Sequence, residues 1–328
     1  MSRQFTITHN GTPGPVARGA FVAGVIALAV LVKACGDSKP RVENIPQEQG
    51  TAIAAPVVNT ASAPESPRPL VTGPVTFGDA ETAFHEGRFD DAVALFTAYT
   101  EQKPENVWGF YMLGLSEWKS GKLDEAVVAF ETAHQKDSTH RKTLVNLARV
   151  LLALKRPSEA LTQGQHVVQL DSSSVEGWRI VGRAYTDLDS TEQAIAAYQR
   201  SLALDDTDVW SMNNLGVIYL ESGRYEQALR PLARAAELAP ERAVFQNNLG
   251  MVLERSGQPT AAATAYRAAI AADTSYAKAI TSLARVEGRT EASGVVPVDL
   301  AAISLEFQNE IGKWKQGGVA VPTVGVKP

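Results

Sequence analysis

The sequence has little cysteine, few aromatic residues and no excess of positive charge. One cysteine among 328 residues excludes a disulfide framework within the chain, a cysteine-rich zinc site and a dithiol redox pair. Lys and Arg total 31 against 36 Asp and Glu, so the formal net charge is −5. Because no basic excess is available to neutralise a phosphate backbone, we expect no nucleic-acid partner. Hydrophobic residues make up 45% of the chain, which excludes wholesale disorder.

The apolar stretch near the N-terminus is shorter than a typical membrane-spanning helix. Residues 19–32 follow Arg3 and Arg18 and carry no charge. Their length falls short of the ~17–25 residues of a spanning helix and fits the ~7–15 residues of a signal-peptide core. Ala34 and Cys35 follow, and a small residue before the only cysteine resembles the lipobox of bacterial lipoproteins, from which Lys33 departs. This resemblance implies cleavage before Cys35 and lipidation of its thiol.

Two alternatives for residues 1–35 stay open beside the lipoprotein signal. They are an uncleaved membrane anchor, in which Cys35 is a chance thiol, and an apolar patch without a targeting role. The first two interpretations attach the protein to a membrane of the bacterial cell envelope and place its body in the periplasm or otherwise outside the cytoplasm. Residues 36–73 are rich in Pro, Ala, Ser and Thr, which predicts a flexible linker because proline lacks an amide donor.

A repeat of 34 residues dominates the rest of the chain. One ladder of small residues is spaced by 34 throughout: Ala92, Ala126, Ala160, Ala194, Ala228 and Ala262. A second ladder lies twelve positions upstream: Ala80, Gly114, Ala148, Gly182, Gly216 and Gly250, and it continues to Ala284. Two rows of small residues per period predict two helices that cross closely in each repeat.

The residues around these ladders resemble the tetratricopeptide repeat, whose pattern is Trp-x2-Leu-Gly-x2-Tyr, then Ala-x3-Phe, then Pro. One copy reads Trp178-x2-Val181-Gly182-x2-Tyr185 with Ala194-x3-Tyr198, and another reads Leu215-Gly216-x2-Tyr219 with Ala228 and Pro240. The resemblance implies an all-α, right-handed superhelical solenoid. We expect six repeats over residues 74–274, a capping helix over 275–288, and a loop, an amphipathic helix and a tail over 289–328.

The turns within the repeats differ from copy to copy. Glycines occupy the turn in four repeats, where a left-handed residue ends the first helix: Gly87, Gly121, Gly223 and Gly257. Asp189 replaces this glycine in the fourth repeat, and we expect Ser190 and Gln193 to form a capping box there. The third repeat has Gly164 in place of the aromatic residue, which predicts that its second helix is the least stable.

The predicted amphipathic helix near the C-terminus has two interpretations. Its apolar residues recur at helical spacing: Leu300, Ile303, Phe307, Ile311 and Trp314. The helix is either a second cap on the array or an internal ligand in the groove, which competes there with a partner.

Motifs for catalysis are missing from the sequence. It contains no His-Glu-x-x-His helix, no Gly-x-Ser-x-Gly elbow, no phosphate loop and no Rossmann glycine fingerprint. The histidines are scattered over different repeats, so we expect no metal site. We therefore expect a protein that is not an enzyme and needs no cofactor.

The resemblance implies that the first helix of each repeat lines a concave face that binds a protein or peptide partner. The family's inward positions, carried over to this sequence, give the candidate partner-binding residues: Trp108, Tyr111, Trp118, Arg149, Arg179, Arg183, Trp210, Asn213 and Asn247. Aromatic residues dominate one end of this set, arginines the middle and asparagines the far end.

Each group has a functional and a structural interpretation. The aromatic residues form an exposed wall for an apolar side chain, or they pack against the first repeat or the linker. The arginines bind a carboxylate or an acidic segment, or Glu176, Asp187 and Asp189 neutralise them. The pairs Asn213-Asn214 and Asn247-Asn248 bind an extended peptide backbone, or they bond between repeats.

These patterns predict a non-catalytic scaffold or adaptor, tethered to a membrane through its N-terminus. The alternatives are a chaperone-like holdase anchored in the inner membrane, and an accessory subunit of an envelope enzyme. We expect a protein or peptide partner whose identity the sequence does not specify.

Overall fold

The computed structural model describes residues 73–317 and residue 319, and in this part of the chain all regular secondary structure is α-helical. The helices are α1 (Phe77–His85), α2 (Phe89–Gln102), α3 (Val107–Lys119), α4 (Leu123–Lys136), α5 (Arg141–Ala153), α6 (Pro157–Leu170), α7 (Val175–Asp187), α8 (Thr191–Leu204), α9 (Val209–Glu221), α10 (Tyr225–Leu238), α11 (Ala243–Arg255), α12 (Pro259–Ala272), α13 (Ala277–Val286) and α14 (Leu300–Gly317). The predicted all-α fold is confirmed.

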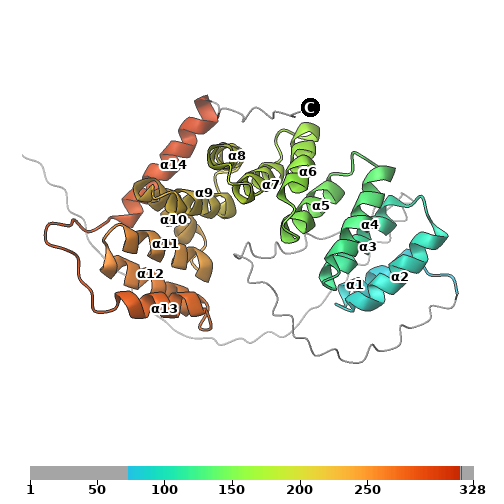
Figure 1. Cartoon of the computed structure of the whole chain (residues 1–328), viewed down its shortest axis with the longest axis horizontal. Coiled ribbons are helices and arrows are strands. Elements are labelled where there is room, and N and C mark those ends of the chain that lie inside the picture. The colour runs from blue at the N-terminus through green and yellow to red at the C-terminus, as the bar shows by residue number, and fades with distance from the viewer. Residues whose placement is uncertain (1–72, 318, 320–328) are drawn as a thin grey trace, which may run out of the picture. The chain divides into compact units, whose positions relative to one another are not determined.

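Helices α1 to α12 form six helix-turn-helix pairs in chain order (Figure 1). We call the odd-numbered helix of each pair the first helix and the even-numbered one the second helix. The two helices of a pair pack against each other, and each second helix also contacts the first helix of the next pair. Neighbouring first helices also approach each other closely along their backbones, from α1 and α3 to α11 and α13, whereas the backbones of successive second helices lie further apart. The first helices therefore form the more crowded side of the array.

The ladders of small residues lie where the two helices of a repeat cross. All six alanines of the first ladder are fully buried. In the second ladder, a Cβ atom on Gly114, Gly182, Gly216 or Gly250 would lie 2.4–2.9 Å from the side chain sixteen residues further along, Phe130, Tyr198, Leu232 or Tyr266. Ala284 ends this ladder in α13 and is exposed, because no second helix follows α13.

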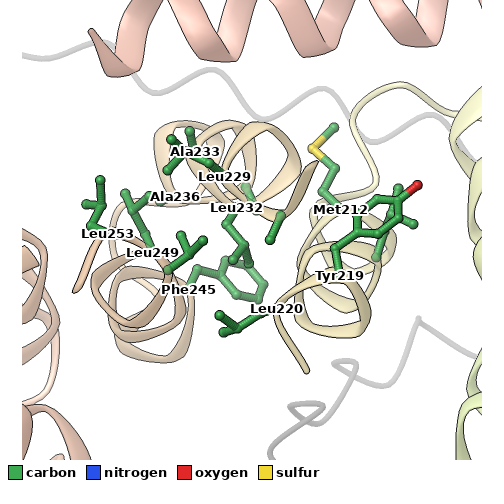
Figure 2. Packing of buried hydrophobic residues seen from close by; sticks show 14 of the residues in the cluster. Met212, Tyr219, Leu220, Leu229, Leu232, Ala233, Ala236, Phe245, Leu249 and Leu253 are labelled. Atoms are coloured by element: carbon green, nitrogen blue, oxygen red, sulfur yellow. The ribbon is translucent and has the colours of Figure 1, made fainter. Parts of the chain in front are cut away.

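The core is continuous from one repeat to the next. Figure 2 shows this for three helices, with Met212 and Tyr219 of α9, Leu232 of α10, and Phe245 and Leu249 of α11 packed together. Each second helix buries one side against its own first helix and the other against the next repeat. A single repeat leaves this second side uncovered, so the repeats stabilise one another.

Backbone turns end each first helix in the predicted way. The four turn glycines have φ between 73° and 79°, and the two repeats without glycine place Lys155 (φ 58°) and Asp189 (φ 54°) in the same left-handed conformation. The predicted capping box at Ser190 and Gln193 is wrong, because the Ser190 side chain makes no bond to the start of α8. Ser190 has ψ 68° instead of the extended conformation with which Asn106 and Ser174 cap α3 and α7.

Four of the turns that follow second helices share an Asp-x-Ser/Thr motif. At Asp137, Asp171, Asp205 and Asp273 the carboxylate accepts bonds of 2.6–3.0 Å from the backbone N–H and the hydroxyl of the residue two positions on. These bonds hold the pKa of Asp137, Asp171 and Asp273 below its usual value. The turn side chains thus replace backbone bonds that the helix ends cannot make.

Gly164 in the third repeat allows a close contact with the next repeat. A Cβ atom on Gly164 would lie 2.8 Å from Cγ2 of Ile180 in α7, so a larger side chain at this position would collide with Ile180. The lower stability of α6 stays a prediction.

Helix α14 lies across the second helices α8 and α10 (Figure 1). Both interpretations from the sequence are therefore wrong, since α14 neither caps the end of the array nor contacts a first helix. Its apolar residues Phe307 and Ile311 are 1% exposed. Arg230 of α10 lies 3.7 Å from Glu306 and 3.8 Å from Glu310, and Lys315 lies 2.7 Å from Asp206, so charges beside the apolar stripe favour this position.

Within the described residues, no helix is both long enough and apolar enough to span a membrane. The predicted signal or anchor (residues 1–35) and nearly all of the predicted linker lie outside the described residues.

Candidate functional site

The candidate site is the side of α3, α5, α7, α9 and α11 that carries the predicted partner-binding residues. We call it the first-helix face and define it by its partly exposed side chains: Trp108, Trp118, Lys142, Arg149, Arg179, Arg183, Trp210, Asn214, Val217, Val244, Asn248, Met251 and Glu254. Helix α14 packs on second helices only, so it leaves this face uncovered.

The aromatic end of the face is built on a buried tyrosine. Tyr111 is 3% exposed, and its hydroxyl oxygen accepts a bond of 3.0 Å from the Asn146 amide. Trp108 packs edge-on against Tyr111, with ring centroids 5.5 Å apart, and against His140 at 4.8 Å. The expected aromatic wall is thus corrected: Trp108 and Trp118 are partly exposed, whereas Tyr111 supports Trp108 from within the core. Burial raises the pKa of Tyr111 to about 12.

The three predicted arginines are all paired with carboxylates. Arg149 pairs with Glu176 and also donates a bond of 3.2 Å to the Asn146 side chain. Arg179 lies 2.8 Å from Asp208, and Arg183 lies 3.1 Å from Asp187. In the middle of the face, carboxylates therefore neutralise the arginines, which is the structural interpretation of the two that the sequence left open. Asp208, which the sequence analysis did not consider, neutralises Arg179 in place of Asp189.

Asp208 is a buried anchor point that the sequence analysis missed. Its side chain is 3% exposed and accepts bonds from Arg179, from the hydroxyls of Ser211 (2.6 Å) and Ser201 (3.1 Å), and from the backbone N–H of Trp210 (3.2 Å). A signal was present, because Asp208 occupies the repeat position at which Asn106 and Ser174 cap their helices.

Of the two predicted asparagines, Asn213 bonds between repeats, whereas Asn247 donates to Asn248 and Met251 of its own helix. Asn248 donates a bond of 2.8 Å from its amide to the Asn213 side-chain oxygen. Asn213 and Asn247 are 3% and 2% exposed, so neither amide is presented to a partner. The partly exposed amides are those of Asn214 and Asn248, one position further along each helix. The Asn248 amide is already bonded to Asn213, and the oxygens of Asn214 and Asn248 each accept a bond of 3.4 Å from the preceding asparagine.

The far end of the face is apolar and aromatic. Trp210 packs edge-on against Phe245 with ring centroids 5.1 Å apart, and the Arg242 guanidinium lies 5.7 Å from the Trp210 ring. Met251 is 38% exposed. Glu254 accepts two bonds from Arg285 (2.7 and 2.8 Å), which hold the pKa of Glu254 below its usual value.

Groups for metal chemistry do not converge in the described part of the chain. No cluster of three or more His, Cys, Asp or Glu side chains has an arrangement that would hold a metal ion there. Two histidines meet between α4 and α6, where the rings of His134 and His166 have centroids 5.4 Å apart. The predicted lipidation site, Cys35, lies outside the described residues.

Comparison with known proteins identifies the repeats. Three family models, each described as a tetratricopeptide repeat, match residues 117–171, 177–241 and 213–277. A DnaJ homolog subfamily C member 7 homolog of Schizosaccharomyces pombe is 32% identical over 79 residues, which make up 23% of this chain and 17% of that protein. The match therefore spans only a small part of this curated relative.

Two solved structures have a similar fold. A tetratricopeptide repeat protein from Parabacteroides merdae superposes with a TM-score of 0.56 at 15% identity, covering 73% of this chain and 90% of that one. A chain of the APC/C hetero-tetramer Cut9-Hcn1 gives a TM-score of 0.54 at 18% identity, covering 71% of this chain and 45% of that one. The helix pairs, the two ladders and the matching family models agree, and the chain is therefore a tetratricopeptide repeat protein.

Proposed function

We propose that the protein is a non-catalytic scaffold that binds a partner protein or peptide on its first-helix face. One observation carries the proposal: α14 packs on the second helices α8 and α10 and leaves the first-helix face free, with three tryptophans and a methionine at least partly exposed on it. Large aromatic side chains with part of their surface exposed are the groups that contribute most to protein binding. The absence of catalytic motifs from the sequence is consistent with a binding role.

Capture of partners by matched variants tests this proposal. The double variant Trp108→Ala/Trp210→Ala removes the two aromatic anchors, and Leu305→Ala removes an apolar side chain that is 57% exposed on α14. We expect the double variant to lose the proteins that the wild type captures, since each anchor contributes about 2 kcal/mol or more. Leu305→Ala keeps them. Equal capture by the double variant, with an unchanged helical circular dichroism spectrum, would place the binding site elsewhere.

The proposed site of action is the bacterial cell envelope. The support is the order of residues at the N-terminus: a basic head, the apolar stretch 19–32, then Ala34, Cys35 and a proline-rich segment. In this proposal the acylated Cys35 holds the protein at a membrane, and the segment 36–73 gives the array its reach.

The intact mass of the native, membrane-extracted protein tests the attachment. We expect a chain that begins at Cys35 and carries acyl groups, and we expect the variant Cys35→Ser to lose this mass. A full-length chain without modification would contradict lipidation. It would favour the second candidate, an anchored, chaperone-like holdase of the inner membrane, because residues 1–34 would then persist.

A further inference from the structure

Of the helices that the structure describes, α14 alone bridges two second helices. It packs on both α8 and α10, whose own backbones do not approach each other closely (Figure 1). In a repeat array each repeat contacts only its neighbours, so the junction between two repeats is the place where their separation changes most easily. A helix that lies across α8 and α10 therefore braces the junction between the fourth and fifth repeats.

Ion pairs fasten α14 to both repeats. On the side of the fifth repeat, Arg230 of α10 lies 3.7 Å from Glu306 and 3.8 Å from Glu310. On the side of the fourth repeat, Lys315 lies 2.7 Å from Asp206, which comes just after the end of α8. The first half of α14 is thus tied to α10, and its last turn to the end of α8.

Apolar packing fastens α14 between these ion pairs. Phe307 and Ile311 are 1% exposed and belong to the same buried cluster as Ile195 of α8 and Leu229 of α10. Ile195 and Leu229 occupy the same position of two successive repeats, 34 residues apart. Because a close-packed interior resists deformation, this packing opposes a change in the separation of α8 and α10.

The opposite side of the same junction carries part of the first-helix face. There Arg179 of α7 lies 2.8 Å from Asp208, which in turn accepts a bond of 3.2 Å from the backbone N–H of Trp210 in α9. Each first helix packs on its own second helix. A change in the separation of α8 and α10 therefore moves α7 relative to α9, and Trp210 moves with α9.

We propose that α14 is a splint that fixes the separation of the fourth and fifth repeats and so holds the first-helix face at Trp210 ready for a partner. The proposal rests on the proposed function, because it assigns a positioning device to the same face. A surface that is already ordered loses less conformational entropy when a partner binds. Release of α14 therefore weakens binding, although α14 does not lie on the face.

Distance measurements between two spin labels test the splint in the full chain. The labels are placed on cysteines introduced at Gln135 of α4 and Glu221 of α9, both exposed, in a Cys35→Ser background. This pair spans the junction that α14 bridges. The control pair joins Gln135 to the exposed Gln193 of α8 and so ends before that junction. We expect a narrow distance distribution for both pairs when α14 is unaltered.

Two matched variants of α14 distinguish release from added charge. Phe307→Asp/Ile311→Asp places two charges in the buried stripe, where an unpaired charge is costly, so α14 should leave its seat. Leu305→Asp/Gln308→Asp places two charges on the exposed side of the same helix. We expect the first variant to broaden the 135–221 distribution and to leave the 135–193 distribution narrow. The second variant should change neither.

A charge reversal tests the same contact without altering the buried stripe. Arg230→Glu faces Glu306 and Glu310 with a like charge, and we expect it to broaden the 135–221 distribution in part. Adding Glu306→Arg/Glu310→Arg to this variant restores opposite charges and should restore the narrow distribution. Such a rescue would show that the broadening comes from loss of the bridge and not from general unfolding.

Three results would overturn the splint. They are a 135–221 distribution that stays narrow in both Phe307→Asp/Ile311→Asp and Arg230→Glu, a 135–193 distribution that broadens equally, and equal broadening by the variant of the exposed side. Capture of partners that depends on the tryptophans but is undiminished when α14 is released would overturn its effect on the face. The scaffold fails separately, since equal capture by Trp108→Ala/Trp210→Ala would remove the binding site and leave the measured distances unchanged.

Discussion

The close crossing of α11 and α12 gives a sharp prediction for Gly250→Ala. The new Cβ atom would lie 2.5 Å from Cε1 and 2.6 Å from Cδ1 of Tyr266, about 1 Å inside normal carbon contact. Tyr266 is fully buried, and its hydroxyl bonds to Glu254 at 2.9 Å, so the ring has no free space into which to move. Alanine is a better helix former than glycine by ~1 kcal/mol, but overpacking a core costs up to ~3 kcal/mol. We expect a net loss of about 1–2 kcal/mol in the free energy of unfolding.

A matched control separates packing from helix propensity. Gly312 lies inside α14, and a Cβ atom there would have no atom within 4 Å. Gly312→Ala should therefore raise the free energy of unfolding by up to ~1 kcal/mol. Urea unfolding followed by circular dichroism measures both variants.

Removing the ring gives a second control. In a Tyr266→Ala background the added methyl group of Gly250→Ala meets no ring, so the same substitution should become neutral or stabilising. This change of sign is the coupling that a double-mutant cycle measures. If Gly250→Ala stabilises the otherwise unaltered protein as much as Gly312→Ala does, the account of the small-residue ladders is wrong.

Three further predictions concern single side chains. Asp208→Ala should lower the free energy of unfolding by about 3 kcal/mol in urea titrations, since it leaves Arg179 unpaired, and no loss would contradict the role of this anchor. Replacing Lys155 or Asp189 by glycine should raise it by about 1 kcal/mol, because both residues have positive φ; an unchanged midpoint would refute this. Burial, with a smaller effect of Glu125, raises the pKa of Glu117 to about 7, so the folded protein binds this proton more tightly than the unfolded chain. Stability should therefore fall as the pH rises from 5 to 8, and Glu117→Leu should remove that part of the pH dependence; an identical pH profile in Glu117→Leu would contradict it.

The sequence predicted the fold well because a repeat multiplies weak signals. One alanine spaced by 34 from another carries little information, but six in succession fix the period, and the glycine ladder fixes where the helices cross. The same 34-residue period also predicted the helix α13 and the end of the second ladder at Ala284, which is exposed.

The position of α14 could not be predicted in this way. Its stripe of Phe307, Ile311 and neighbouring apolar residues shows that one side is buried, but the same stripe fits a cap, a groove or the second helices. The contacts that decide between them join residues far apart in sequence, such as Lys315 and Asp206.

The sequence predicted which side of the array carries the candidate site better than it predicted which side chains are exposed there. Helical spacing placed Trp108, Arg149 and Trp210 on the correct side of the array. It did not show that Tyr111 and Asn213 are buried, because burial there depends on how closely the neighbouring first helix approaches. Pairing of Arg179 with Asp208 also joins two repeats, and a single repeat gives no sign of it.

Photo-cross-linking in living cells tests most directly whether partners bind the first-helix face. Met251 on that face and Val128 on the second helix α4 are both exposed apolar residues, 38% and 63% respectively, and each is replaced in turn by a photoreactive phenylalanine derivative. We predict discrete adducts of higher mass from position 251 and none from position 128. Adducts from position 128 alone would contradict the central claim and place the binding surface on the second helices.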